Sequence, residues 1–201
     1  MGTAWKTPPT APIATQKLMT KKETTMAHSN VYIILPEFSP YYKKPEQADI
    51  YDEEDVFEKL TPIANYVESY DETEETKVQN YIQFKKELIN TFGIGEISEN
   101  EEAEISITKK GIEDFFYRMA NNVKQILEQT KDQKTFIENA RYKIQEEINE
   151  RYGIYFLMPG HYTCYVRNKT YFAEELYYYF KQHPEKKKVK IRLKQTFSYH
   201  H

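Results

Sequence analysis

Residues 186–201 read KKKVKIRLKQTFSYHH, and basic and apolar side chains alternate strictly in the middle of this stretch. Because successive side chains of a β-strand point to opposite faces, the alternation predicts a strand at 187–197 with two different faces. The apolar face carries Val189, Ile191 and Leu193. The basic face carries Lys188, Lys190, Arg192 and Lys194. Burying each apolar side chain is worth about 1.5–3 kcal/mol, which is enough to fix which face turns inward.

Three explanations fit the basic face of this strand. An edge strand uses lysines to discourage pairing with other chains. Carboxylates of the acidic helices can neutralise the row, although surface ion pairs add little stability. The third explanation is binding of a polyanion, with tyrosines such as the run at 177–179 offering faces on which bases can stack.

The segment before the strand predicts a β-β-α-β unit at the C-terminal end. Residues 154–166 contain the apolar stretch IYFLM, a Pro-Gly turn and the stretch YTCYV, a pattern that is typical of a hairpin. A helix from about 170 to 181 follows, and the alternating strand completes the unit.

Two pairs of helices are predicted upstream of this unit. A helix from 108 to 127, with a threonine N-cap, has the strongest helical spacing, and a partner at about 132–151 completes an antiparallel hairpin. The other pair combines a helix at 74–91 with apolar residues of helical spacing from 56 to 70. Pro62 interrupts that second pattern, which leaves open two short helices or one kinked helix.

The fold expected from these elements is α+β, with the two helical pairs packed on a mostly antiparallel sheet. That sheet is expected to include 31–35, the 154–166 hairpin and 187–197, while isoleucines alternating at 105 and 107 predict a further short hairpin. Residues 1–30 have no apolar periodicity and are predicted to be a flexible leader. Residues 31–201 are predicted to form a single domain.

Charge is distributed unevenly along this chain of net charge −3. Residues 46–104 hold 18 acidic and 4 basic side chains, a balance of −14. Residues 109–201 hold 11 acidic and 18 basic side chains, a balance of +7. The expected domain therefore combines an acidic helical part, 46–104, with a basic α/β part, 109–201.

Cysteine and histidine usage argues against several classes of protein. The single cysteine, Cys164, excludes an intramolecular disulfide framework, and with five scattered histidines it gives no familiar zinc-site spacing, so no metal or cofactor is predicted. A reducing, cytoplasmic setting fits this composition. No apolar run approaches the roughly 18 residues that span a bilayer, so no membrane partner is expected.

The sequence assigns no catalytic residue, and enzymatic activity stays an open question. His161 and Cys164 lie three positions apart, so on one strand they would face opposite sides and not form a nucleophile–base pair. A small nuclease is the third of three functional hypotheses, and its chemistry would be assembled from the basic strand together with His161, Tyr165, Arg167 and Lys169.

The first hypothesis is a non-catalytic intracellular protein that binds single-stranded RNA or DNA through the basic strand. The expected contacts are Lys188, Lys190, Arg192, Lys194, Arg167 and Lys169. The alternative hypothesis is an inhibitor or adaptor whose acidic helical surface imitates a nucleic acid and binds a basic protein.

Overall fold

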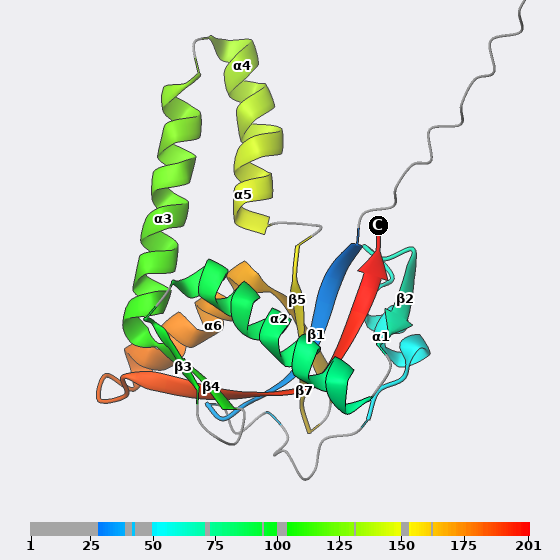
Figure 1. The fold of residues 1–201 in the computed structure, drawn as a ribbon. Helices are drawn as coiled ribbons and strands as arrows, with labels where there is room; N and C mark the ends of the chain where they lie inside the picture. Colours follow the sequence, from blue (N-terminus) through cyan, green and yellow to red (C-terminus); the bar gives the residue numbers. More distant parts are fainter. Residues whose placement is uncertain are drawn as a thin grey trace, which may run out of the picture.

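The computed structural model describes residues 28–38, 42, 50–70, 73–93, 95–99, 104–130, 132–149, 153–161 and 163–201. The elements in chain order are β1 (His28–Pro36), α1 (Glu53–Leu60), β2 (Tyr66–Ser69), α2 (Glu74–Phe92), β3 (Ile97–Glu99), β4 (Glu104–Thr108), α3 (Lys109–Glu128), α4 (Gln133–Glu138), a π-helical segment (Asn139–Ile144), α5 (Gln145–Asn149), β5 (Tyr155–Pro159), β6 (Cys164–Asn168), α6 (Lys169–Gln182) and β7 (Lys188–His200). Figure 1 shows their arrangement.

The fold is α+β, as the sequence predicts. One seven-stranded sheet has the order β3-β4-β7-β1-β5-β6, and β2 pairs with β7 outside this path. Only the β1–β5 pair is parallel among the described ladders. The predicted hairpins are both present, as β3–β4 and β5–β6, and the C-terminal unit is completed by α6 and β7.

β7 is a central strand, so the explanation that treats it as a protected edge is wrong. Its first half, 188–192, pairs with β4, and its last residues, 197–200, pair with β2 on the same side. Residues 191–200 pair with β1 on the other side. Alternation in the sequence reports which face of a strand is apolar, but it does not report how many neighbours the strand has.

A β-bulge interrupts β7 at Lys194. Gln195 pairs with Ile33 and Leu193 pairs with Ile34, so Lys194 is an extra residue without a partner position in β1. An extra residue moves the following side chains to the opposite face. The single row of four cations predicted from the sequence therefore ends at Arg192.

The two faces of the sheet have separate apolar cores. α2, the first turns of α3, and α6 cover one face, where Phe172, Phe156 and Ile191 are fully buried. α1 covers part of the other face, where Phe197 and Tyr199 pack with side chains of β1 and α1. The shift at the bulge explains why β7 supplies odd-numbered residues to both cores.

Side-chain caps begin the long helices α2, α3 and α6, and the sequence predicts the one at the start of α3. The hydroxyl oxygens of Thr73 and Thr108 accept hydrogen bonds from the first turns of α2 and α3. Asn168 does the same for α6, accepting from the backbone N–H of Tyr171 at 2.9 Å. These three helices match their predicted ranges to within a few residues.

Some predicted elements are wrong in detail. The segment after Pro62 forms a turn and then β2 instead of a second short helix, a known ambiguity of short apolar runs. His28–Asn30, expected in the leader, belong to β1, while residues 1–27 lie outside the described part. The helical hairpin is present but projects from the sheet in Figure 1, and Phe136 and Ile137 on its predicted apolar stripe are exposed.

Candidate functional site

One buried carboxylate is shared by two cations in the middle of the predicted basic row and offsets one of their two charges. The Nζ atom of Lys190 lies 2.9 Å from Oε1 of Glu104, and Nη2 of Arg192 lies 3.3 Å from Oε2 of the same carboxylate. Glu104 is placed there because β4 pairs Glu104 with Arg192, and its side chain is only 5% exposed. The explanation by internal neutralisation therefore holds for these two cations, although the carboxylate comes from a strand and not from a helix.

Replacing Glu104 by glutamine is expected to lower the free energy of unfolding by about 1–2 kcal/mol. Breaking a fully buried pair costs about 3–5 kcal/mol, but Lys190 and Arg192 are 48% and 37% exposed and water compensates much of the loss. Urea unfolding measures the change. Glu113→Gln, whose partner Lys109 lies 3.9 Å away on the surface, is the control and should change little. Equal effects of the two variants would contradict the assignment.

The other predicted contacts lie apart from one another. Lys188 is exposed at the start of β7, whereas Lys194 lines a groove beside the bulge. Arg167 on β6 is held by the carboxylate of Glu175 and lies 5.5 Å from the ring of Tyr165. Lys169 begins α6 and lines a polar cleft. The six cations therefore do not form one surface.

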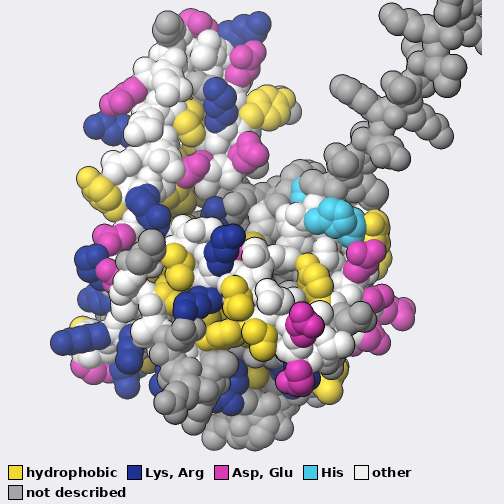
Figure 2. All heavy atoms as spheres, viewed as in Figure 1, with side chains coloured by type: hydrophobic (Ala, Val, Ile, Leu, Met, Phe, Trp, Pro, Cys, Tyr) yellow, Lys and Arg dark blue, Asp and Glu magenta, His cyan; other side chains and the backbone are white. Residues whose placement is uncertain are grey.

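A cluster of lysines instead gathers where α3 begins and α6 ends. The backbone N–H of Lys109 donates to the carbonyl of Lys187 at 2.9 Å, which ties the first residue of α3 to the loop before β7. The exposed lysines brought together here are Lys181, Lys186, Lys187 and Lys188. Figure 2 shows this group of Lys and Arg side chains at the lower left.

Most charges of this lysine cluster are uncompensated. Within the part of the chain that the structure describes, Lys181 and 186–188 have no ion pair. The neighbouring Lys110 differs, because Glu96 at 2.6 Å and Asp114 at 2.9 Å raise the pKa of its ammonium group. Lysines without carboxylate partners keep their positive potential available to a ligand.

Exposed aromatic rings lie next to the lysine cluster on α6. Tyr177 is 42% exposed and Tyr178 is 59% exposed, and their ring centroids are 5.8 Å apart. Phe116 packs edge-on against Tyr177 and supports its ring. A small depression beside the ring of Tyr177 is lined by Lys109, Lys181 and Glu113, whose carboxylate lies 3.9 Å from Lys109. We call this set the basic–tyrosine surface: Lys109, Tyr177, Tyr178, Lys181, Lys186, Lys187 and Lys188.

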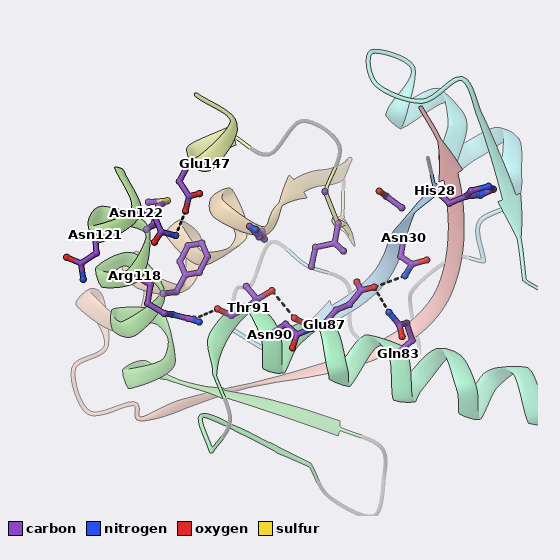
Figure 3. Close-up of a pocket in the computed structure, with 16 residues that line it drawn as sticks. His28, Asn30, Gln83, Glu87, Asn90, Thr91, Arg118, Asn121, Asn122 and Glu147 are labelled. Atoms are coloured by element: carbon purple, nitrogen blue, oxygen red, sulfur yellow. Dashed lines mark hydrogen bonds between the residues drawn. The ribbon is translucent and has the colours of Figure 1, made fainter. Parts of the chain in front are cut away.

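A second candidate site is a polar cleft of about 720 Å³ between β1, α2, α3, α5 and the start of α6. Figure 3 shows side chains from these elements converging on it. Amide side chains dominate its lining, and four of them are Asn30, Asn90, Asn121 and Asn122. Its volume falls in the range of small-molecule sites.

Glu87 of α2 is the central charged group of this cleft. Its Oε1 accepts hydrogen bonds from the amides of Asn30 at 2.7 Å and Gln83 at 2.8 Å. Its Oε2 is buried and has no hydrogen-bond partner within the described residues. The phenol of Tyr32 is buried beside this group, and burial, together with the Glu87 carboxylate, raises the pKa of Tyr32.

Further side chains hold the walls of the cleft in place. The guanidinium group of Arg118 donates to the carbonyl of Thr91, which connects α3 to α2. The amide of Asn122 donates to Glu147 at 2.8 Å, which connects α3 to α5 (Figure 3). The cleft is therefore framed by cross-links between three helices.

The structure offers no support for a nucleophile or a metal centre in the described residues. His161 is exposed in a bend, and burial raises the pKa of the half-buried Cys164 thiol, which disfavours its nucleophilic thiolate. The ring of His200 packs between His28 and Tyr66, yet no group of three His, Cys, Asp or Glu side chains in the described ranges is arranged to hold a metal ion. No helix within those ranges has the length and apolar character needed to cross a membrane.

Comparison of the chain with protein-family models, curated proteins and solved structures finds no match. The assignment of function therefore rests on the geometry of the two candidate sites. Sequence reasoning missed Glu87 and the asparagines, because they come from three distant segments and no local spacing marks them. It names Lys188, Lys169 and the tyrosine run, but it expects the two lysines on one surface, whereas they line different parts of the structure.

Proposed function

We propose that the protein binds single-stranded nucleic acid through the basic–tyrosine surface. The observation that carries the proposal is the juxtaposition of the four lysines without ion pairs, Lys181 and 186–188, with the two exposed rings of Tyr177 and Tyr178. Lysines attract the phosphates of a strand, and bases stack on tyrosine rings with little dependence on their sequence. The proposal keeps the reducing, cytoplasmic setting expected from the lone cysteine.

This surface differs from the interface that the sequence suggests. Lys188 belongs both to the basic–tyrosine surface and to the interface predicted from the sequence. Lys190 and Arg192 share the carboxylate of Glu104, which offsets one of their two charges, so we assign them a smaller share of the phosphate attraction. Arg167 is engaged by Glu175, and Lys194 lies beside the bulge of β7. We assign the principal role in phosphate attraction to Lys186 and Lys187, in the loop before β7.

Labelled single-stranded oligonucleotides titrated at several salt concentrations test the proposal. Each phosphate contact to a single strand contributes about −0.7 to the slope of log affinity against log salt. Converting Lys186, Lys187 and Lys188 to glutamine together is therefore expected to flatten that slope by about 2. Fluorescence anisotropy measures the affinity.

A variant with the same change of charge provides the control. Lys124→Gln, Lys134→Gln and Lys143→Gln remove three exposed lysines from the projecting hairpin, away from the basic–tyrosine surface. This triple variant should keep most of the salt dependence. Replacing Tyr177 and Tyr178 by alanine should weaken binding by about 1–3 kcal/mol for each stacked base while leaving the slope nearly unchanged. Equal losses in the two lysine variants, or no binding at low salt, would refute the proposal.

The acidic surface supports the alternative function. Figure 2 shows carboxylates gathered at the right, on the side of α1 and β2. The first turn of α1 carries Glu53, Glu54 and Asp55. A protein that imitates a nucleic acid would show no affinity for oligonucleotides and would bind a basic protein in a salt-sensitive way, so the same titrations separate the two functions.

A further inference from the structure

We propose that the polar cleft binds a nucleobase that carries an exocyclic amino group, with Glu87 accepting a hydrogen bond from that group. The cleft lies apart from the basic–tyrosine surface, and it can receive the base of a free nucleotide as well as a base of a strand.

The edge of the ligand must supply a hydrogen-bond donor. Glu87 receives two amide donors on Oε1, and the Tyr32 phenol is hydrogen-bonded to the same carboxylate, while Oε2 is buried and has no other partner in the described part of the chain. A buried acceptor with an unused lone pair favours an additional donor, and more so when the group is charged. An exocyclic amino group next to a carboxylate is the pairing by which Glu and Asp recognise cytosine in nucleic-acid interfaces.

The amides of the cleft suit the remainder of a base edge. Asn90 and Asn121 line the cleft, and their side-chain amides have no hydrogen-bond partner among the described residues. Each side-chain amide presents a donor and an acceptor side by side, the arrangement that pairs with the adjacent amino group and ring nitrogen of adenine. Cytosine has the same neighbouring pair of groups on its Watson–Crick edge.

The apolar wall and the cations of the cleft match the other parts of a nucleotide. Phe115, Met119 and Ile154 provide apolar lining against which the face of a flat ring can lie. Arg118 and Lys169 place positive charge at the same cleft, where a phosphate would interact with them. A neutral sugar would satisfy amides and the carboxylate but would give these cations no anionic partner.

Cytosine and uracil form the sharpest comparison, because they differ at the group that would meet Glu87. Cytosine presents an amino donor there, whereas uracil presents a carbonyl oxygen, which the carboxylate repels. Sites built around such a donor discriminate strongly against an analogue that lacks it. Calorimetric titration of the full chain with CMP and with UMP is expected to show CMP bound at least about tenfold more tightly, corresponding to about 1.4 kcal/mol.

Glu87→Gln tests the role of the carboxylate directly. A glutamine amide can accept from cytosine or donate to uracil, so the ratio of CMP to UMP affinity should fall towards one. Glu75→Gln is the matched control, because Glu75 is an exposed carboxylate on the same helix. Should Glu87→Gln unfold the protein, Asn90→Ala at an exposed position of α2 replaces it and is expected to weaken CMP binding several-fold.

The outcomes separate this inference from the proposed function. The Lys186, Lys187 and Lys188 to glutamine variant should keep the CMP preference, since these lysines lie outside the cleft. A preference for oligocytidine over oligouridine that disappears in Glu87→Gln would place a base of the strand in the cleft, whereas discrimination among mononucleotides alone would assign the cleft to free nucleotides. Absence of mononucleotide binding, equal affinity for CMP and UMP, displacement of CMP by a neutral sugar, or an unchanged ratio in Glu87→Gln would overturn the inference.

Discussion

Replacement of Ile191 by proline is expected to lower the free energy of unfolding by more than about 3 kcal/mol. Ile191 is fully buried and pairs with Ile105 of β4 on one side and with Pro36 of β1 on the other. Proline removes a backbone donor from the ladder, and it is tolerated in sheets only at edges, strand starts and bulges. The loss of a large buried side chain adds about 2–5 kcal/mol.

Two further variants isolate the contribution of the backbone. Ile191→Ala removes the side chain and keeps the N–H group, so Ile191→Pro should be the more destabilising of the two in urea unfolding. Lys187→Pro introduces the same ring immediately before the strand, at an exposed loop position, and should cost less than about 1 kcal/mol. If proline and alanine at position 191 cost the same, β7 would behave as an edge strand and the central pairing would be wrong.

Replacement of Phe172 by alanine is expected to destabilise the protein by about 3–5 kcal/mol. Phe172 on α6 is fully buried, and its ring centroid lies 4.6 Å from that of Phe156. It also lies 6.4 Å from the rings of Phe38 and Phe92, so one side chain connects the sheet, α2 and the segment after β1. Removing it leaves a cavity that neighbours from several elements cannot fill together.

Phe136→Ala is the control for this second prediction. Phe136 is 49% exposed on α4, so the same truncation there removes little buried area. We expect a change of less than about 1 kcal/mol, measured as the urea midpoint at constant slope. Similar losses at the two positions would show that the helical hairpin is packed against the rest of the protein and does not project from it.

Several features of the fold could be predicted because their signals are local. Thr108 marks the start of α3, since an N-cap side chain bonds to a backbone N–H three residues later in the same chain. The apolar spacing of α2 and the alternation at the start of β7 report burial of one face. Each of these signals lies within one element, so the sequence carries it completely.

The candidate sites were predictable only in part. The sequence indicates that lysines and tyrosines are concentrated near the C-terminal end, and Lys188, Tyr177 and Tyr178 do lie on the basic–tyrosine surface. It could not indicate that Lys169 faces the polar cleft, because the side of α6 on which each residue lies depends on packing against other elements. The cleft itself combines β1, α2 and α3, whose proximity no spacing in the chain reveals.

The amino-acid sequence by itself therefore determined the class of fold, the long helices and the alternation of β7, because each follows from periodicity and capping over a few neighbouring residues. The tertiary structure alone decided that β7 is central, that Lys194 forms a bulge and that Glu104 pairs with Lys190 and Arg192. Glu104 and Arg192 lie 88 positions apart in the sequence. Contacts over such separations depend on strand register and on the packing of the whole sheet, which local preferences do not specify.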